Sequence, residues 1–231
     1  MSAVIFDLDD TLYDQLEPFK KAVQKNFFFP SSQIEDLYLF SRSFSDEVFD
    51  LTHTGKMQLE AMYIYRMQNA CAQFGMDLTV KQALQFQEDY AYFQGKIELF
   101  EDAKELLDYC KQQGMTTGLI TNGPTGHQWA KIQQLGLTRW ISEKNIFISS
   151  TVGISKPDTR LFEHVERSMD LDKKDTYYVG DSYENDVIGA KSAGWKAVWH
   201  NHRGHTRPET KVMFDQLLDR KTSLTELIYI L

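Results

Sequence analysis

The sequence predicts an α/β fold in which a doubly wound parallel sheet carries an inserted helical domain. From Phe100 onward, short apolar runs alternate with segments of helical periodicity, which is typical of βαβ units and a parallel sheet. The apolar run 4–6 has the same strand character. Residues 15–96 show helical periodicity alone. We therefore expect a Rossmann-like core formed by residues 1–14 and 97–231, and a helical domain formed by residues 15–96.

The helical stretch contains four predicted helices. They are a first helix that ends before Pro30, a second from Ser32 to about His53, a third over 58–74 and a fourth from Thr79 to near Gly95. Two of their starts have the spacing of a capping box, in which side chains bond the first free backbone N–H groups. These are Ser32 with Glu35, and Thr79 with Gln82.

The remainder of the chain alternates between strands and helices. The predicted strands are 116–121, 146–149, 176–179 and 197–200, and the predicted helices are 101–113, 125–135, 158–169, 183–193 and about 223–231. Glycines follow several of these helices, as they do at many helix ends. The first strand and the later strands are expected to share one sheet.

Composition limits the possible functions. The chain has 231 residues, of which 42% are hydrophobic and 25% charged, as in a soluble globular protein. Its net charge of -8 argues against a nucleic-acid backbone or an anionic membrane surface as the main partner. The absence of a basic leader and of a long apolar stretch favours a cytoplasmic location. Cys71 and Cys110 lie in predicted helices at no metal-binding spacing, so we expect buried, reduced thiols.

Polar residues follow the predicted strands where each strand ends. In chain order they are Asp7 and Asp9, Thr121 and Asn122, Lys156, and Asp181 and Asp186. The carboxyl ends of parallel strands meet at one edge of a sheet, where ligands bind. Asp7 and Asp9 also project to the same side if the chain stays extended, because side chains alternate along a strand. One pocket is therefore expected to hold several carboxylates, a hydroxyl and an amine.

The chemistry of such a pocket points to phosphate. Clustered carboxylates repel one another, and a hard cation such as Mg²⁺ suits oxygen ligands that have no His or Cys beside them. A cation and an ammonium group together would bind a phosphate dianion. One carboxylate can then attack phosphorus, and a second carboxylic acid can protonate the leaving oxygen.

These residues resemble the four motifs of the haloacid dehalogenase superfamily of phosphohydrolases. The matching segments are Asp7-Leu8-Asp9-Asp10-Thr11, Thr121-Asn122-Gly123, Lys156-Pro157 and Gly180-Asp181 with Asp186. The resemblance covers the whole chain, and it implies that the helical insertion is a mobile cap that closes over the substrate.

The resemblance also implies a role for each motif residue. Asp7 would be the nucleophile that forms an aspartyl-phosphate, and Asp9 would protonate the leaving group and later activate water. Thr121 and Lys156 would hold the phosphoryl oxygens, with help from the backbone amide of Asn122.

A Mg²⁺ site is implied as well. Its ligands would be Asp7, the backbone carbonyl of Asp9 and Asp181, while Asp186 would bind through water or pair with Lys156. Structural roles are the alternatives at two of the motifs. Thr121 and Asn122 could cap the next helix, and Asp186 could interact with a helix macrodipole.

The resemblance favours a phosphatase. Dehalogenating members lack the second aspartate, which is present here as Asp9. The expected substrate is a small phosphorylated metabolite, a nucleotide or a sugar phosphate. The alternatives are a phosphosugar mutase of the same fold and a non-catalytic module that binds phosphate or accepts a phosphoryl group. The Trp199 end of a strand, with Asn201 and Gly204 after it, resembles the nucleotidase-like branch. The substrate and the oligomeric state stay open.

Several neighbouring features have plainer structural interpretations. Asp10 is expected to shape the turn, and Thr11 to tighten the loop behind Asp7. Aromatic residues of the insertion are expected to form its core. They include Phe27, Phe28, Phe29, Phe40, Phe44, Phe49, Tyr63, Tyr65, Tyr90 and Phe93. The histidines of the segment 200–205 are expected to lie in an exposed loop and not in a metal site.

Overall fold

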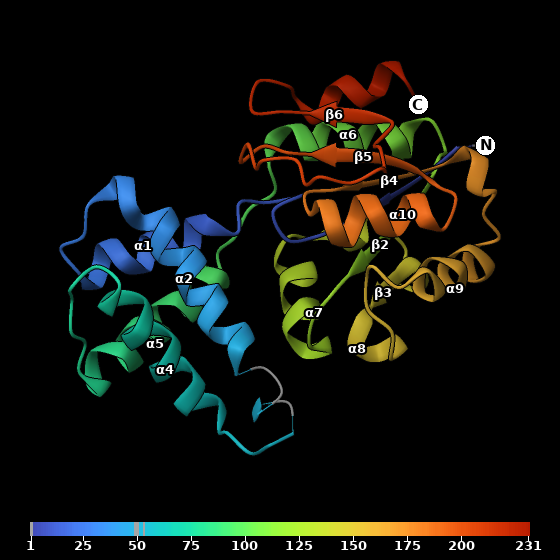
Figure 1. The fold of residues 1–231 in the computed structure, drawn as a ribbon. Coiled ribbons are helices and arrows are strands. Elements are labelled where there is room, and N and C mark those ends of the chain that lie inside the picture. Colours follow the sequence, from blue (N-terminus) through green and yellow to red (C-terminus); the bar gives the residue numbers. More distant parts are fainter. Residues whose placement is uncertain (1, 49–50, 53) are drawn as a thin grey trace. The chain divides into compact units, whose positions relative to one another are not determined.

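The computed structural model describes residues 2–48, 51–52 and 54–231. It contains two compact units, and the chain passes between them after Asp14 and before Ile97. The terminal segments form an α/β unit around a sheet, and the stretch between them forms a helical unit (Figure 1). Each unit has its own hydrophobic core.

The sheet of the α/β unit is parallel throughout. In the described residues it has six strands in the order β3-β2-β1-β4-β5-β6. The strands are β1 (Ala3–Phe6), β2 (Thr116–Thr121), β3 (Ile146–Ile148), β4 (Thr176–Gly180), β5 (Lys196–His200) and β6 (Gln216–Leu218). The strand order reverses at β1, because β2 and β3 lie on one side of it and β4, β5 and β6 lie on the other. Such a reversal opens a crevice at the carboxyl ends of the strands.

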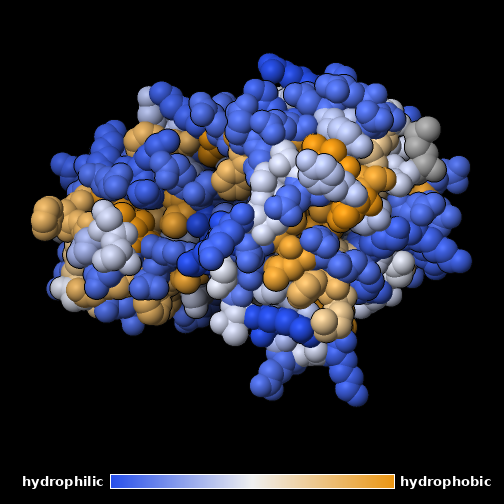
Figure 2. Space-filling model, turned by 90° about the horizontal axis from the view of Figure 1, so that it is seen from above, coloured by the Kyte–Doolittle hydropathy of each residue, from blue (hydrophilic) through white to orange (hydrophobic). Residues whose placement is uncertain are grey.

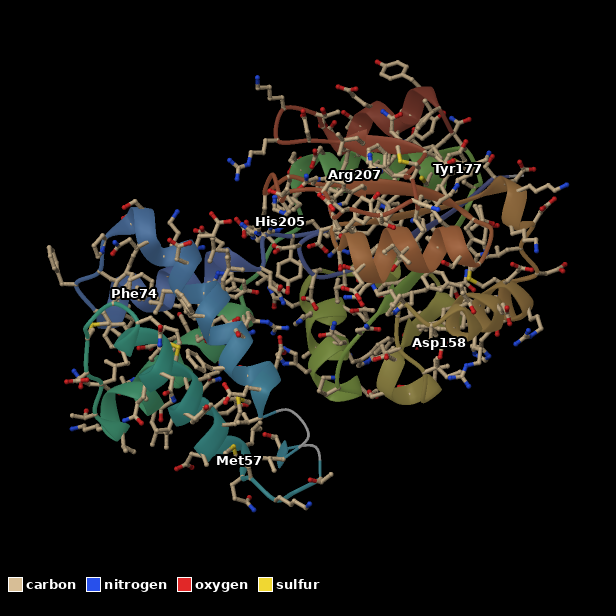
Figure 3. All side chains as sticks on the ribbon, viewed as in Figure 1. Met57, Phe74, Asp158, Tyr177, His205 and Arg207 are labelled. Atoms are coloured by element: carbon tan, nitrogen blue, oxygen red, sulfur yellow. The ribbon has the colours of Figure 1, made fainter. Side chains whose placement is uncertain are left out.

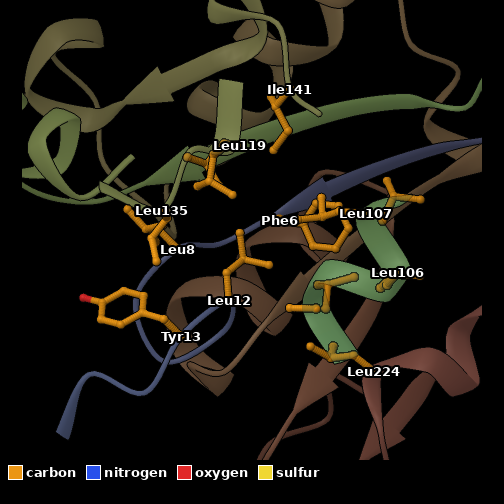
Figure 4. Packing of buried hydrophobic residues seen from close by; sticks show 14 of the residues in the cluster. Phe6, Leu8, Leu12, Tyr13, Leu106, Leu107, Leu119, Leu135, Ile141 and Leu224 are labelled. Carbon is orange, nitrogen blue, oxygen red and sulfur yellow. The ribbon is translucent and has the colours of Figure 1, made fainter. Parts of the chain in front are cut away.

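Helical segments cover both faces of the sheet. They are α6 (Glu101–Gln112), α7 (Thr125–Gln134), α8 (Ser149–Val152), α9 (Thr159–Met169), the π-helical η5 (Tyr183–Ile188), α10 (Gly189–Ser192) and the 3₁₀ segment η6 (Leu224–Tyr229). Side chains alternate along β1, so Val4 and Phe6 join the core that contains α6, while Ile5 joins the core that contains α9. Figure 4 shows Phe6 beside Leu107 of α6. The predicted doubly wound fold is confirmed.

The helical unit is built on aromatic contacts. Its helices are α1 (Leu16–Asn26), α2 (Ile34–Glu47), α4 (Leu59–Ala72) and α5 (Val80–Gln94), with a 3₁₀ turn at Ser31–Gln33. Phe19 of α1 packs edge-on against Tyr38 at 5.2 Å and Phe86 at 5.2 Å between ring centroids. Phe74, labelled in Figure 3, packs in the same way against Phe29. The described helices α1, α2, α4 and α5 all contribute side chains to one core.

Some details of the predicted helical unit differ in the structure. The capping box of Thr79 and Gln82 is present, but Ser32 makes none, because α2 begins at Ile34 after a 3₁₀ turn. Phe28 is fully exposed and not in the core. The predicted helix end at His53 and the side chain of Phe49 lie outside the described residues.

The α/β unit also departs from prediction near its carboxyl end. Strand β6 was not predicted, and the predicted helix 183–193 is a π-helical turn followed by a short α-helix. Cys71 and Cys110 are free and buried, as expected, and burial raises the pKa of Cys71 to about 12. Within the described part of the chain, no helix is long and apolar enough to cross a bilayer. Figure 2 shows a largely hydrophilic face with hydrophobic residues in separate patches.

Candidate active site

Asp7 lies at the carboxyl end of β1, where the strand order reverses. Its backbone N–H donates to Val179 O at 2.8 Å, which places the residue directly beyond β1 and against β4. The side chain is buried, and Oδ1 accepts a hydrogen bond of 2.5 Å from Lys156 Nζ. Thr11 Oγ1 donates to Oδ2 at 3.3 Å, as expected for a hydroxyl that tightens this loop. The carboxylate is therefore fixed at the point where the strand order reverses.

Lys156 is held by its backbone as well as by its ammonium group. Lys156 N donates to Asn122 Oδ1 at 2.9 Å, and Asn122 Nδ2 donates to Lys156 O at 3.0 Å. The ammonium donates to Asp7, to Asp186 Oδ1 at 2.6 Å and to Tyr178 Oη at 2.9 Å. Three donated bonds use the full hydrogen-bonding capacity of a lysine. Burial alone would lower the pKa of Lys156, but the charges of Asp186 and Asp7 raise it well above its ordinary value.

Asp7, Asp181 and Asp186 form an acidic cluster. One carboxylate oxygen from each lies within 4.8 Å of the others. Gly180 allows this approach, because a Cβ atom there would lie 2.4 Å from the Asp186 carboxyl group. Ser182 N donates to Asp186 Oδ2 at 2.9 Å and holds the carboxyl group in place.

The cluster has the electrostatics of a cation site. Burial raises the pKa of Asp7 to about 7, with Lys156 opposing this shift and Asp186 reinforcing it. Burial and the charges of Asp186 and Asp7 raise the pKa of Asp181 well above its ordinary value. Like charges held together in this way favour the binding of a positive ion. Among the described residues this group consists of three carboxylates, which match the ligands of a hard divalent cation such as Mg²⁺.

Asp9 is bound by a separate set of donors. Lys131 Nζ donates to Oδ1 at 2.6 Å, Gln128 Nε2 donates to Oδ2 at 2.9 Å, and the Tyr13 hydroxyl donates to Oδ1. Burial alone would raise the pKa of Asp9, but the Lys131 charge and these hydrogen bonds lower it to about 2. Asp9 is therefore ionised in the free protein at neutral pH.

Thr121 and Asn122 do not cap the next helix through their side chains. Helix α7 is preceded by Pro124 and has no side-chain cap. Thr121 is buried, and its Oγ1 accepts a hydrogen bond of 2.5 Å from Gln128 Nε2. Asn122 bonds the backbone of Lys156 instead. Gln128 thus links Thr121 to Asp9, and Asn122 links the end of β2 to Lys156.

Hydrogen bonds from Arg203 hold the turn after Asp9 in place. Asp10 has a φ of 57°, which suits a turn, and its carboxylate accepts bonds of 2.5 and 2.8 Å from the Arg203 guanidinium. The same guanidinium donates to Asp14 Oδ1 at 2.6 Å. The prediction of an exposed loop at 200–205 is therefore wrong in part. His200 ends β5 and is buried, and only 11% of the Arg203 side chain is exposed.

Four polar residues of this region carried no recognised sequence signal: Gln128, Lys131, Tyr178 and Arg203. A polar pair at 128 and 131 on a helix normally indicates a solvated face, and a tyrosine within a strand normally indicates core. The spacing of three residues between Gln128 and Lys131 was the one available signal, because it places both on the same side of a helix.

A family model, two curated proteins and a solved structure each match most of this chain. A family model described as haloacid dehalogenase-like hydrolase matches residues 1–194. Glyceraldehyde 3-phosphate phosphatase of Methanothermobacter thermautotrophicus is 28% identical over 211 residues, covering 87% of this chain and 86% of that protein. Ribulose-1,5-bisphosphate 5-phosphatase of Halopiger xanaduensis is 27% identical over 245 residues, covering 98% and 99%. The crystal structure of Bacillus subtilis YfnB bound to magnesium has a TM-score of 0.69 at 21% identity, covering 99% and 97%.

Proposed function

Because the chain belongs to the haloacid dehalogenase-like hydrolases and is a phosphatase, we propose that it hydrolyses small phosphomonoesters through a phosphoryl group carried on Asp7. The observation that supports this most directly is the position of the Asp7 carboxylate. It lies 2.5 Å from a buried ammonium group and within an acidic cluster that suits a divalent cation. A nucleophile, a phosphate-binding cation and a metal site thus meet at one point.

We propose that Asp7 attacks phosphorus while the leaving oxygen takes a proton from Asp9. The new bond joins an Asp7 carboxylate oxygen to phosphorus, and the bond to the leaving oxygen breaks. Water then attacks the same phosphorus and gives its proton to Asp9, which frees Asp7 and inorganic phosphate. Arrival of a phosphate dianion beside Asp9 favours the protonated carboxyl group, because like charges repel.

Further residues would hold the phosphoryl group. Thr121 and Lys156 would bind its oxygens, together with the backbone amide of Asn122, and Lys156 would exchange one of its three present hydrogen bonds to do so. Mg²⁺ would be held by Asp7, Asp181 and the backbone carbonyl of Asp9, with Asp186 as a partner of Lys156 or a ligand through water. When bound, the ion would neutralise part of the charge that gathers on the phosphoryl oxygens.

We propose sugar phosphates as the first substrate class to examine. Two relatives that align with most of the chain are named for sugar phosphates, glyceraldehyde 3-phosphate and ribulose 1,5-bisphosphate. Nucleoside monophosphates are the second class. The helical unit would act as the cap that selects among them.

A screen of phosphate release tests the proposal. Phosphorylated sugars, nucleoside monophosphates and p-nitrophenyl phosphate are incubated with the protein, with Mg²⁺ or with excess chelator. We expect Mg²⁺-dependent turnover of at least one sugar phosphate without any bisphosphate activator. A requirement for a bisphosphate with little phosphate release would indicate a mutase instead. A phosphorylated protein that persists for hours without turnover would indicate a phospho-acceptor module.

A further inference from the structure

Helix α7 presents a polar face to the interior of the α/β unit. Gln128 is 1% exposed and Lys131 is 5% exposed, and the two residues lie three positions apart on the same side of the helix. Gly123, with a φ of 142°, lets the chain approach Gln128 closely, because a Cβ atom there would lie 3.1 Å from its side chain. The start of α7 is thus shaped around a buried glutamine.

Both oxygens of the Asp9 carboxylate are bound from this face. Lys131 Nζ lies 2.6 Å from Oδ1, and Gln128 Nε2 lies 2.9 Å from Oδ2. An oriented donor on each oxygen fixes the plane of the carboxyl group as well as its position. Of the Asp9 side chain, 21% remains exposed, so the group that is held still reaches the solvent side of the site.

Gln128 also donates a hydrogen bond to the Thr121 hydroxyl. The amide nitrogen carries two hydrogens, and it contacts two acceptors, Asp9 Oδ2 and Thr121 Oγ1. Since Thr121 Oγ1 accepts this bond, its own hydrogen stays available to a further acceptor. One glutamine side chain therefore orients both the second carboxylate and the hydroxyl that would bind a phosphoryl oxygen.

Packing alone does not account for these residues. Removing an ammonium group from water costs several kcal/mol, and a buried ion pair seldom stabilises a protein more than apolar side chains of similar volume. Methionine at position 131 and leucine at position 128 would fill similar space without that cost. The burial of Lys131 and Gln128 is therefore better explained by a role in the chemistry of Asp9.

We propose that Lys131 and Gln128 are positioning residues that hold the Asp9 carboxyl group toward the leaving oxygen of the substrate. This inference rests on the proposed function, because it concerns the proton that Asp9 would transfer. It predicts a selective defect. Esters whose leaving group is a poor one need that proton, whereas p-nitrophenyl phosphate, whose leaving group is a stable anion, needs it far less.

The test compares Lys131→Met with wild type on two substrates, an alkyl phosphate chosen from the screen and p-nitrophenyl phosphate. The rate compared is that of phosphoryl transfer to Asp7 in the first turnover, because the later hydrolysis step, which also uses Asp9, is common to both substrates. We expect this rate to fall about 100-fold for the alkyl ester and by no more than about 3-fold for p-nitrophenyl phosphate. Lys131→Arg should restore most of the loss, because it keeps a donor and a charge. Lys144→Met, at an exposed position of the same unit, is the matched control and should match wild type on both substrates.

A double-mutant cycle makes the inference specific to Asp9. Asp9→Ala should show the same selective defect in this first step, together with slower hydrolysis of the phosphoryl group from either substrate. Adding Lys131→Met to it should cost the first step little more, because both changes remove one function. Gln128→Leu should give a smaller defect of the same kind, and it serves as the test if Lys131→Met does not fold. Equal losses of the first-step rate on both substrates, or additive losses of it in the double variant, would overturn the inference. Inactivity of the wild type on every ester would instead refute the proposed function.

Discussion

Lys156 Nζ and Asp7 Oδ1 lie 2.5 Å apart, although the two residues are 149 positions apart in the chain. The contact exists because parallel strands bring their carboxyl ends to one edge of the sheet, where β1 delivers the aspartate and the chain beyond β3 delivers the lysine. Asp186 shares the same ammonium group at 2.6 Å. Lys156 thus compensates two buried carboxylates and faces the atom that we propose as the nucleophile.

Lys156→Met should reduce both stability and activity. Asp7 and Asp186 would lose a shared buried partner, so the free energy of unfolding should fall by about 3 kcal/mol in urea titrations without Mg²⁺. The loss of a cation that stabilises transferring phosphoryl charge should lower kcat by about 100-fold or more. Lys144→Met should leave both quantities unchanged. A wild-type kcat in Lys156→Met would show that Lys156 does not take part in catalysis.

Mg²⁺ should stabilise the protein through the acidic cluster. A ligand that binds the folded state alone adds about 3 kcal/mol at a concentration about one hundred times its dissociation constant. We therefore expect a higher thermal unfolding midpoint as Mg²⁺ is added, and a much smaller increase in Asp181→Asn. Asp77→Asn, at an exposed position outside the cluster, should respond as wild type does. An equal response in Asp181→Asn would show that the ion binds elsewhere.

Arg203→Met should weaken the turn that carries Asp9 and Asp10. The variant removes the hydrogen bonds from one guanidinium to Asp10 and Asp14, so we expect a loss of about 2 kcal/mol in the free energy of unfolding. Arg207→Met, whose arginine is exposed and labelled in Figure 3, is the matched control. If both variants unfold at the same urea concentration as wild type, the turn does not depend on Arg203.

His200 should make stability depend on pH. Burial lowers its pKa to about 4, so between pH 6.5 and 4 the unfolded chain binds a proton that the folded protein does not. The free energy of unfolding should therefore fall by up to about 3 kcal/mol as the pH falls through this window. His200→Phe should reduce this slope, and His205→Gln, at an exposed position, should not. An unchanged slope in His200→Phe would contradict the assignment.

The fold could be predicted because apolar periodicity is a local signal. Strands β1 to β5 each show a short apolar run, and turn residues separate them from the helices. Strand β6 could not be found in this way, because its three residues include the partly exposed Leu217 and no helix leads into it. Its place in the sheet depends on pairing with β5, which the sequence does not display locally.

The sequence predicted those residues of the site that follow a predicted strand, and it missed the others. The structure brings together the predicted Asp7, Lys156, Asp181 and Asp186. Lys131 and Arg203 were missed, because a charged residue on a helix or after a strand normally faces solvent. Their burial becomes visible only when Asp9 and Asp10 are seen beside them. The same is true of His200, whose burial follows from its place at the end of β5.

The proposed phosphoryl group on Asp7 can be measured directly. The protein is mixed with an excess of a radiolabelled substrate from the screen, quenched in acid within the first turnover, and digested for mass spectrometry. We predict a protein-bound phosphoryl group on the peptide that contains Asp7, removed by hydroxylamine and absent from Asp7→Asn. Rapid release of phosphate with no labelled protein at any quench time, or a label on another residue, would contradict the account.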